Sequence, residues 1–458
     1  MTRPRRSIGR HRIERGPAGG PRDRTPRPHP IPQQPEDGPL DHVSIALVGT
    51  RGVPARYGGF ETAVEEVGRR LAERGHRVVV YCRTVPGAGE APPAEHLGME
   101  LVHLPAARRR SLETLSHTAL SVRHLLTHRT DAAIVFNSAN APLLPALRAA
   151  RIPVATHVDG LEWKRAKWGP AGRRYYRVAE ALAVRWSDVL IADAEGIAEY
   201  YREAFAAPTT LLTYGAPLIA PGSHRLAELG LEPGGYHLAV ARFEPENHVD
   251  VVVEGYTASE ATKPLVVVGS APYADDYTRR VHALADERVR FLGGVWDQEL
   301  LDQLYANCAT YLHGHSVGGT NPSLLRAIGA GAAVTAFDVD FNREVVRDSG
   351  RFFRTPQDVA REIAAVEADP EGTRRAGRRA RLLAARYDWD EVAGGYEELA
   401  LRLAARDVPR RRPSGRRRPT AADAPLAPRP QPAPPADNVV PLPTAGSAPW
   451  AHLPAGQQ

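Results

Sequence analysis

A glycine-rich segment late in the chain runs directly into a predicted helix. The segment reads HSVGGTNPSLLRAIG, His315 to Gly329, and it follows a strand-like run over Ala309–Leu312. Asn321 is a favoured helix N-cap and Pro322 a favoured first helical residue, so we expect the helix to begin there. A helix start offers unpaired backbone N–H groups at the positive end of the helix dipole. This pattern predicts a site for a phosphate or diphosphate.

A second glycine-rich turn follows the first predicted strand, Val43–Val48. It reads GTRGVPARYGGFE, and its Gly58 and Gly59 come directly before a predicted helix that ends near Ala72. Glycines here would let the backbone approach a ligand closely, although a flexible surface loop is the alternative. The spacing is not GxGxxG, and the second strand ends in Arg83 without a carboxylate to hold a ribose. The pattern therefore disfavours a nicotinamide-dependent dehydrogenase.

Further polar residues follow buried strands, at the edge where parallel sheets bind ligands. His157 and Asp159 follow the strand Val154–His157, where they could bind a sugar hydroxyl or take its proton. A structural histidine and a turn aspartate are the alternatives. Arg242 follows a strand of the second half, and its guanidinium suits a diphosphate. Asn247 is either a plain N-cap of the next helix or a ligand contact.

Three short pairs of potential metal ligands occur in the sequence. They are Asp338/Asp340, Asp388/Asp390 and His313/His315. A pair of carboxylates can hold a divalent cation against a sugar nucleotide, but such a short motif is a weak signal. The histidine pair has no third ligand nearby, as zinc would require. We therefore predict no metal site.

The basic charge of the 458-residue chain lies in its two ends. Residues 1–42 carry a net charge of +4 and residues 405–458 one of +5, against +6 for the whole chain. The middle is therefore mildly acidic, which argues against a nucleic-acid-binding domain. Both ends are rich in Pro, Arg and Ala without apolar periodicity, so we predict that they are disordered. The run RRRPSGRRR suits a solvated tail or contact with anionic lipid head groups.

The sequence predicts neither a membrane-spanning nor a secretory segment. No apolar run approaches the ~20 residues that cross a bilayer, and the basic N-terminus has no apolar core behind it. The two cysteines, Cys82 and Cys308, lie in strand-like apolar segments and are interpreted as buried thiols in a reducing compartment. We therefore expect a cytoplasmic protein.

Strand and helix patterns alternate between the two ends, and the series restarts near residue 236. Repeated units of this kind predict an α/β fold with parallel sheets covered on both faces. We expect two Rossmann-like domains, residues 43–217 and 218–388, with ligands bound in the cleft between them. A final helix over residues 389–404 follows the second domain.

Taken together, these segments resemble the retaining GT-B glycosyltransferases of family 4, most closely the DUF1972, rhamnosyltransferase-like subgroup. The resemblance covers about residues 43–404. It is carried by GTRGVPARYGGFE, DGLEWKRAKW, ARFEPEN, HSVGGTNPSLL and FNREV, in that order. It implies a GT-B arrangement in which the second domain binds a nucleotide-sugar donor and the first binds the acceptor. The final helix would cross back to the first domain.

The resemblance also implies roles for individual residues. Arg242 would hold the donor diphosphate, which the Gly58-Gly59 turn would approach, and His157 would contact the donor sugar, with Asp159 beside it in the catalytic site. Asn247 stands where many relatives have lysine. Further donor contacts would come from Ser316, Gly319, Thr320, Asn321 and Arg326.

Arg326 departs from the family pattern. It replaces a glutamate that accepts hydrogen bonds from the nucleotide ribose, whereas a guanidinium only donates. Ribose recognition must therefore differ or donor binding is weakened, unless Arg326 adds a diphosphate contact.

The resemblance implies a transferase that moves a sugar, with dTDP-rhamnose as the expected donor and no metal required. The acceptor would be a glycan or lipid-linked saccharide in surface polysaccharide assembly, which suits peripheral contact with the inner membrane face. No nucleic-acid partner is expected. Three alternatives stay open. They are a non-catalytic GT-B binding protein, which Arg326 favours, a sugar-nucleotide epimerase and a dehydrogenase.

Overall fold

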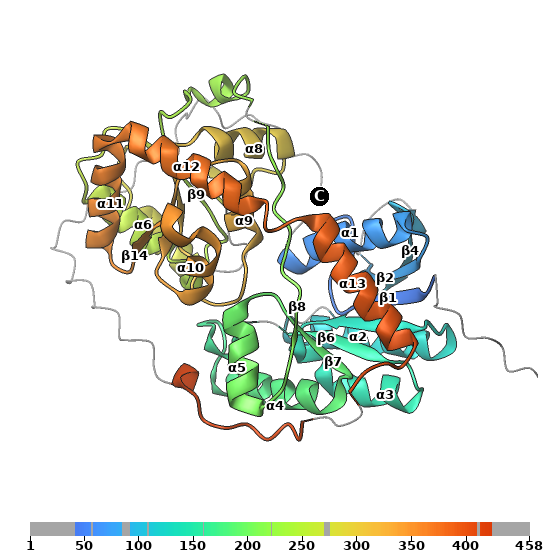
Figure 1. The fold of residues 1–458 in the computed structure, drawn as a ribbon. Helices are drawn as coiled ribbons and strands as arrows, with labels where there is room; N and C mark the ends of the chain where they lie inside the picture. The colour runs from blue at the N-terminus through green and yellow to red at the C-terminus, as the bar shows by residue number, and fades with distance from the viewer. Residues whose placement is uncertain are drawn as a thin grey trace, which may run out of the picture. The chain divides into compact units, whose positions relative to one another are not determined.

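The computed structural model describes residues 42–55, 58–84, 92–107, 110–158, 160–220, 222–269, 275–409 and 413–423. This part of the chain contains two sheets of parallel strands with helices packed on them (Figure 1). The two-sheet α/β architecture expected from the alternating pattern is therefore confirmed. None of the described helices combines the length and the apolar character needed to span a bilayer.

The first sheet has eight strands. They are β1 (Ser44–Val48), β2 (Arg77–Arg83), β3 (Glu95–His96), β4 (Met99–Leu104), β5 (Ala132–Phe136), β6 (Val154–His157), β7 (Val189–Ala192) and β8 (Thr210–Leu211). Their order is β3-β4-β2-β1-β5-β6-β7-β8, and only the short β3–β4 pair is antiparallel. The helices of this domain are α1 (Gly59–Glu73), α2 (Arg110–Thr127), α3 (Leu144–Ala149), α4 (Pro170–Trp186) and α5 (Glu195–Phe205).

The second sheet has six parallel strands. They are β9 (His237–Val240), β10 (Leu265–Val268), β11 (Val289–Gly293), β12 (Thr310–His313), β13 (Val334–Phe337) and β14 (Arg351–Phe353), in the order β11-β10-β9-β12-β13-β14. Its helices are α6 (Val249–Thr257), α7 (Asp275–Ala283), α8 (Gln298–Asn307), α9 (Pro322–Gly329), α10 (Asp340–Val346), α11 (Pro356–Ala368) and α12 (Pro370–Ala384).

The central strands are continuous apolar runs because helices cover both faces of each sheet. Every residue of β5 (AAIVF) and of β10 (LVVV) is buried. Parallel neighbours also need crossover connections, which the helices supply. The carboxyl ends of the strands in one parallel sheet therefore lie at one edge, and the polar loops of the candidate site follow them.

The last helix, α13 (Trp389–Ala404), packs on α1 of the first domain. Asp388 caps it, because its carboxylate accepts hydrogen bonds from two first-turn backbone N–H groups. Glu397 then pairs with Arg74 at 2.6 Å and hydrogen-bonds the His76 ring at 2.9 Å. These contacts tie the end of the second domain's chain to the first domain.

Three features differ from the sequence expectations. The short edge strands β3 and β14 were not predicted, because two or three residues are too few for a periodic pattern. Residues 413–423, within the tail expected to be disordered, lie against the first domain. There the Arg418 backbone N–H donates to the Ala204 carbonyl at 2.6 Å, and Arg417 pairs with Asp423 at 2.9 Å. Residues 1–41 and 424–458 lie outside the described part of the chain.

A carboxyl group is buried between α4 and α5. Glu180 is 2% exposed, and its Oε2 accepts a hydrogen bond from the Tyr200 hydroxyl at 2.9 Å. Burial raises the pKa of Glu180 to about 8, because desolvation disfavours the charged carboxylate. The folded protein therefore holds this carboxyl protonated at neutral pH, whereas in the unfolded chain it ionises near pH ~4.3.

This difference makes stability depend on pH. The favourable contribution of a protonated Glu180 is complete below the unfolded pKa and is lost as pH rises to about 8. We predict that Glu180→Gln, which keeps a neutral acceptor for Tyr200, stabilises the protein by on the order of 1–3 kcal/mol at pH 8.5 and by much less at pH 5. Urea unfolding at the two pH values measures the difference. The exposed Glu199→Gln serves as control, and an equal gain for Glu180→Gln at both pH values would contradict the prediction.

Candidate functional site

The glycine-rich segment between β12 and α9 forms a capped helix start, as predicted. Asn321 is the N-cap of α9, and its Oδ1 accepts from the Ser323 backbone N–H at 2.9 Å and from the Ser323 hydroxyl at 2.6 Å. Pro322 is the first helical residue. Gly318, three residues before the cap, has a φ of 142°, which favours glycine.

Loops from the carboxyl ends of both sheets meet at this helix start. A Cβ on Gly59, in the first turn of α1, would lie 3.2 Å from the Pro322 ring. The Thr320 hydroxyl donates to the Asp193 carbonyl at 2.7 Å, and Asp193 follows β7. Gly319 has no room for a side chain, because the Asp193 carboxylate lies where its Cβ would be. The structure thus brings together the Gly58-Gly59 turn and the loop before α9.

Gly160 completes this close approach from the end of β6. Its Cα faces the backbone of Gly318 so closely that a Cβ would overlap that backbone. Asp159, predicted as a catalytic residue, immediately precedes Gly160 but lies outside the described residues.

Two guanidinium groups give the site its positive charge. Arg242 follows β9, and no carboxylate among the described residues pairs with it. Arg165 forms ion pairs with Glu162 of the first domain and with Glu246 of the second, the latter at 3.2 Å. Arg242 is exposed, yet partial desolvation and the like charge of Arg165 lower its pKa, against the opposing effect of Glu244, Glu246 and Glu162. Arginine remains charged at neutral pH nevertheless, so the site favours an anion.

The turn around Glu162 is a network of local ion pairs. Burial alone would raise the pKa of Glu162, but Arg165 and Lys167 hold it below its usual value. Lys167 Nζ lies 3.1 Å from Glu162 Oε1, and Trp168 donates to the same oxygen at 3.2 Å. Local packing and salt bridging therefore account for these residues.

Asn247 is a link between two loops and not the N-cap of α6. Its amide nitrogen donates to the Arg242 carbonyl at 2.8 Å, and its Oδ1 accepts from His315 Nδ1 at 2.8 Å. The residue before α6 is His248, in the left-handed region with a φ of 45°, and its side chain does not cap the helix. The N-cap interpretation of Asn247 was wrong because the chain inserts a 3₁₀ turn, Pro245–Asn247, before α6.

His315 is neutral and has a fixed tautomer. Desolvation, together with the nearby charges of Arg165 and Arg242, lowers its pKa well below the usual range. Because Nδ1 carries the proton donated to Asn247, Nε2 is the acceptor nitrogen, and it faces Gly318. From the sequence, His315 was only a weak candidate for a metal ligand. Its hydrogen bond to Asn247 is seen only in the structure.

His157 lies at the end of β6, as predicted. Its ring stacks on Phe136 with centroids 5.4 Å apart and meets the edge of Phe60 at 5.0 Å. Burial lowers its pKa to about 3, so the ring is neutral at physiological pH. Nδ1 is buried without a hydrogen-bond partner among the described residues. A neutral imidazole with a spare nitrogen can bind a sugar hydroxyl.

Ser316 and Arg326 are engaged with protein groups. The Ser316 hydroxyl and backbone N–H both contact the Glu246 carbonyl at 3.0 Å. Arg326, on α9, pairs with Asp302 on α8. The guanidinium of Arg326 therefore has a carboxylate partner within the second domain.

Three of the four aspartates in the Asp-x-Asp pairs have structural roles. Asp338 forms ion pairs with Arg343 and Arg354, Asp388 caps α13, and Asp390 pairs with Arg70 of α1.

Sequence reasoning missed three residues of the site. Asp193, Arg165 and Glu246 each follow a strand or lie in the loop after one. Asp193 is buried, with 5% of its surface exposed, and desolvation raises its pKa to about 7. The rule that pointed to His157 could have found Asp193, because it comes directly after the apolar run Val189–Ala192, which forms β7. The Arg165–Glu246 pair spans 81 residues and has no local sequence signal.

Comparison with known proteins matches both domains of the chain to family models. Residues 58–215 match the family model described as glycosyl transferase 4-like domain, and residues 229–383 match the one described as glycosyl transferases group 1. No curated protein sequence matches the chain.

Several solved structures share the fold. Sucrose-phosphate synthase from Thermosynechococcus elongatus is 19% identical, with a TM-score of 0.69 over 79% of this chain and 99% of that one. HepE from Anabaena, in complex with UDP-glucose, is 18% identical, with a TM-score of 0.64 over 78% of this chain and 100% of that one. A glycosyltransferase from Rickettsia africae is 13% identical, with a TM-score of 0.58 over 79% of this chain and 98% of that one. At these identities the likeness shows the fold.

The contact between Gly319 and Asp193 can be tested by adding one methyl group. We predict that Gly319→Ala lowers the free energy of unfolding by about 1–3 kcal/mol, because the loop or the Asp193 carboxylate must move. Gly319→Ala combined with Asp193→Ala should recover part of that loss. Urea denaturation measures both. The control is Gly196→Ala, in α5, where a Cβ meets open space and should be neutral or slightly stabilising. Equal effects of the two glycine substitutions would contradict the prediction.

Proposed function

We infer that this protein transfers a sugar from a nucleoside-diphosphate donor. Its two domains belong to the glycosyl transferase 4-like and glycosyl transferases group 1 families. The observation that carries this inference is the anion-binding arrangement in the cleft. No carboxylate among the described residues forms an ion pair with Arg242, although Glu244, Glu246 and Glu162 lie near enough to act on its pKa. Arg165 and His315, the latter in the loop that leads to α9, are also close to it. Guanidinium groups and a helix N-terminus are suited to a diphosphate.

In the proposed reaction the bond between the sugar and the diphosphate breaks. Negative charge then grows on the departing diphosphate, and Arg242 and the N–H groups at the start of α9 stabilise it. Two contacts fix the local backbone before substrate arrives: Asn247 donates to the Arg242 carbonyl, and Asn321 caps α9. The acceptor hydroxyl would attack on the face from which the diphosphate leaves, with retention of configuration, and its proton would pass to the departing phosphate oxygen.

His157 is proposed to contact the donor sugar. The imidazole is neutral because its pKa is about 3, so it can donate or accept a hydrogen bond without adding charge. Its orientation is fixed by the Phe60 and Phe136 rings. Asp159 is proposed to act on a sugar hydroxyl from the loop that follows.

The donor base and sugar are proposals as well. The resemblance to the rhamnosyltransferase-like subgroup supports dTDP-rhamnose, whereas the solved HepE structure holds UDP-glucose. Arg326, at the position of the family's ribose-binding glutamate, pairs with Asp302, so a carboxylate is present beside it on α8. The proposed acceptor is a glycan or a lipid-linked saccharide in surface polysaccharide assembly, and the proposed location is the cytoplasm.

The second candidate function is a non-catalytic protein that binds a nucleotide sugar. It is favoured by Arg326, which removes the glutamate expected at the ribose. Titration calorimetry with dTDP-rhamnose, UDP-sugars and GDP-sugars, with and without Mg²⁺, identifies a donor. Release of nucleoside diphosphate from that donor, even by slow hydrolysis, would exclude the non-catalytic alternative.

Arg242 offers the sharpest test of the transferase. We predict that Arg242→Ala lowers turnover of the identified donor by about 10²–10³-fold, because one main stabiliser of the leaving group is lost. Arg242→Lys should retain more activity, since it keeps the charge but not the two-point contact. Measurement of kcat with matched Arg279→Ala, an exposed arginine of α7, controls for surface charge. Near-normal turnover by Arg242→Ala would refute its assigned role.

A further inference from the structure

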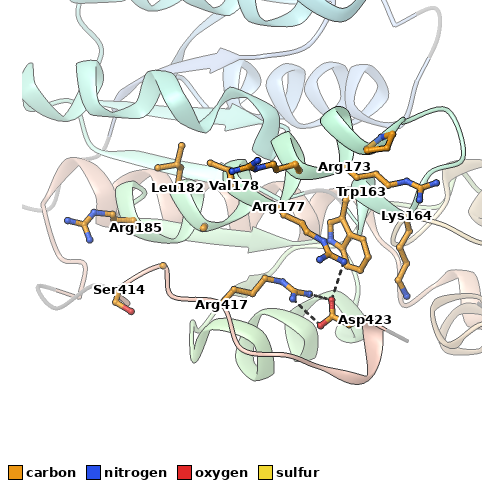
Figure 2. A pocket seen from close by; sticks show the side chains of 14 residues that line it. Trp163, Lys164, Arg173, Arg177, Val178, Leu182, Arg185, Ser414, Arg417 and Asp423 are labelled. Carbon is orange, nitrogen blue, oxygen red and sulfur yellow. Dashed lines mark hydrogen bonds and ion pairs between the residues drawn. The ribbon is translucent and has the colours of Figure 1, made fainter. Parts of the chain in front are cut away.

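A second basic surface lies on the first domain, apart from the cleft residues described above. It is a groove of about 980 Å³ between α4 and residues 413–423 (Figure 2). Six of its lining side chains are basic and one is acidic. The basic ones are Lys164, Arg173, Arg174, Arg177, Arg185 and Arg417, and the acidic one is Asp423.

Most of this positive charge is not neutralised by the protein. Asp423 pairs with Arg417 at 2.9 Å and with Arg177 at 3.3 Å, as the dashed lines of Figure 2 show. Among the residues that the structure describes, no carboxylate pairs with the four remaining cations. They are Lys164, Arg173, Arg174 and Arg185. Four unpaired cations along one groove repel one another, and an anionic ligand would relieve that repulsion.

The groove is also partly apolar. Val178 of α4 is 51% exposed, and Leu182, one turn further along the same helix, is half-buried. Both lie among the arginines in Figure 2. Trp163, the aromatic residue of the lining, is only 6% exposed and is covered by the Arg177 guanidinium, 4.3 Å from its ring. An exposed aromatic platform for stacked bases is therefore missing from the described lining, which disfavours single-stranded nucleic acid.

The spacing of the arginines indicates an extended array of anions. Arg173, Arg177 and Arg185 are separated by four and eight residues along α4, and all three line the groove. Twelve residues of helix rise about 18 Å, which is longer than a single diphosphate. Several phosphates spread over a membrane surface could bind such a row of arginines. The aliphatic side chains between the arginines would then contact the apolar layer beneath the phosphates.

We propose that this groove and the outer face of α4 bind the headgroups of anionic phospholipids at a bilayer surface. The proposal goes beyond the sugar transfer and does not depend on it. Residues 413–423 form one wall of the groove, which gives this part of the C-terminal region a role in binding. At one end of the groove Lys164 is adjacent to Arg165, which pairs with Glu246 of the second domain. Lipid bound there would thus lie near the candidate site.

The test uses the full-length protein and vesicles. The wild type should sediment with vesicles of phosphatidylcholine mixed with phosphatidylglycerol and not with phosphatidylcholine alone. Each basic side chain near an anionic surface contributes about a fivefold factor in binding, so Arg173→Gln/Arg174→Gln/Arg185→Gln should weaken vesicle binding by on the order of 100-fold. These side chains are exposed, and thermal melting together with donor titration verifies that the variant folds and keeps its cleft.

A matched variant separates the groove from general surface charge. Arg375→Gln/Arg378→Gln/Arg379→Gln removes the same charge from exposed positions of α12, and it should change vesicle binding by less than about fivefold. Equal losses in the two triple variants would overturn the proposal, as would absence of binding to anionic vesicles. Displacement from vesicles by millimolar glycerol phosphate at constant ionic strength would overturn it in favour of a soluble phosphate ligand. Tighter binding of single-stranded RNA, lost in the α4 variant, would overturn it in favour of nucleic acid.

Discussion

The candidate site depends on a close approach of backbones at which side chains are almost absent. Gly160 and Gly319 both lack room for a Cβ, and each meets a group from the other domain. Thr320 adds a hydrogen bond to the carbonyl of Asp193 across the same contact. Because the loops are this close, the start of α9 lies next to the carboxyl ends of the first sheet. A larger residue at either glycine would move the two halves of the site apart.

Charge in the cleft is arranged around that contact. Arg165 is neutralised by Glu162 and Glu246 and joins the two domains, whereas Arg242 keeps its charge for a ligand. Arg165 lowers the pKa of Arg242, which stays cationic nevertheless. Desolvation and the charges of both arginines lower the pKa of His315. Within one network, arginine therefore has a structural role at Arg165 and a proposed ligand-binding role at Arg242. What distinguishes the two is the presence of a carboxylate partner, which sequence does not display.

Local rules explain which features the sequence predicts. The N-cap at Asn321, the buried strands and the helix Trp389–Ala404 follow from spacing within a few residues, and the structure contains them. Asn247 satisfied the same capping rule, but a 3₁₀ turn moved the helix start beyond it. The Arg165–Glu246 pair joins residues 81 positions apart, so only the folded chain reveals it. The contacts of residues 413–423 could not be predicted for a different reason, because the composition of this segment is typical of a disordered tail.

Arginine is abundant in this chain, and its abundance alone carries little meaning. Many arginines of the second domain, such as Arg288, donate hydrogen bonds to nearby carboxylates and carbonyls. Unpaired arginines are informative because desolvated or clustered cations are costly without an anion. By that criterion Arg242 marks a compact anion site in the cleft, where a helix start adds directed N–H donors. The row on α4 marks an extended site, where charge is spread along a helix with aliphatic residues between. The difference in geometry, more than any difference in composition, supports the proposed small phosphorylated ligand at the first and the proposed bilayer surface at the second.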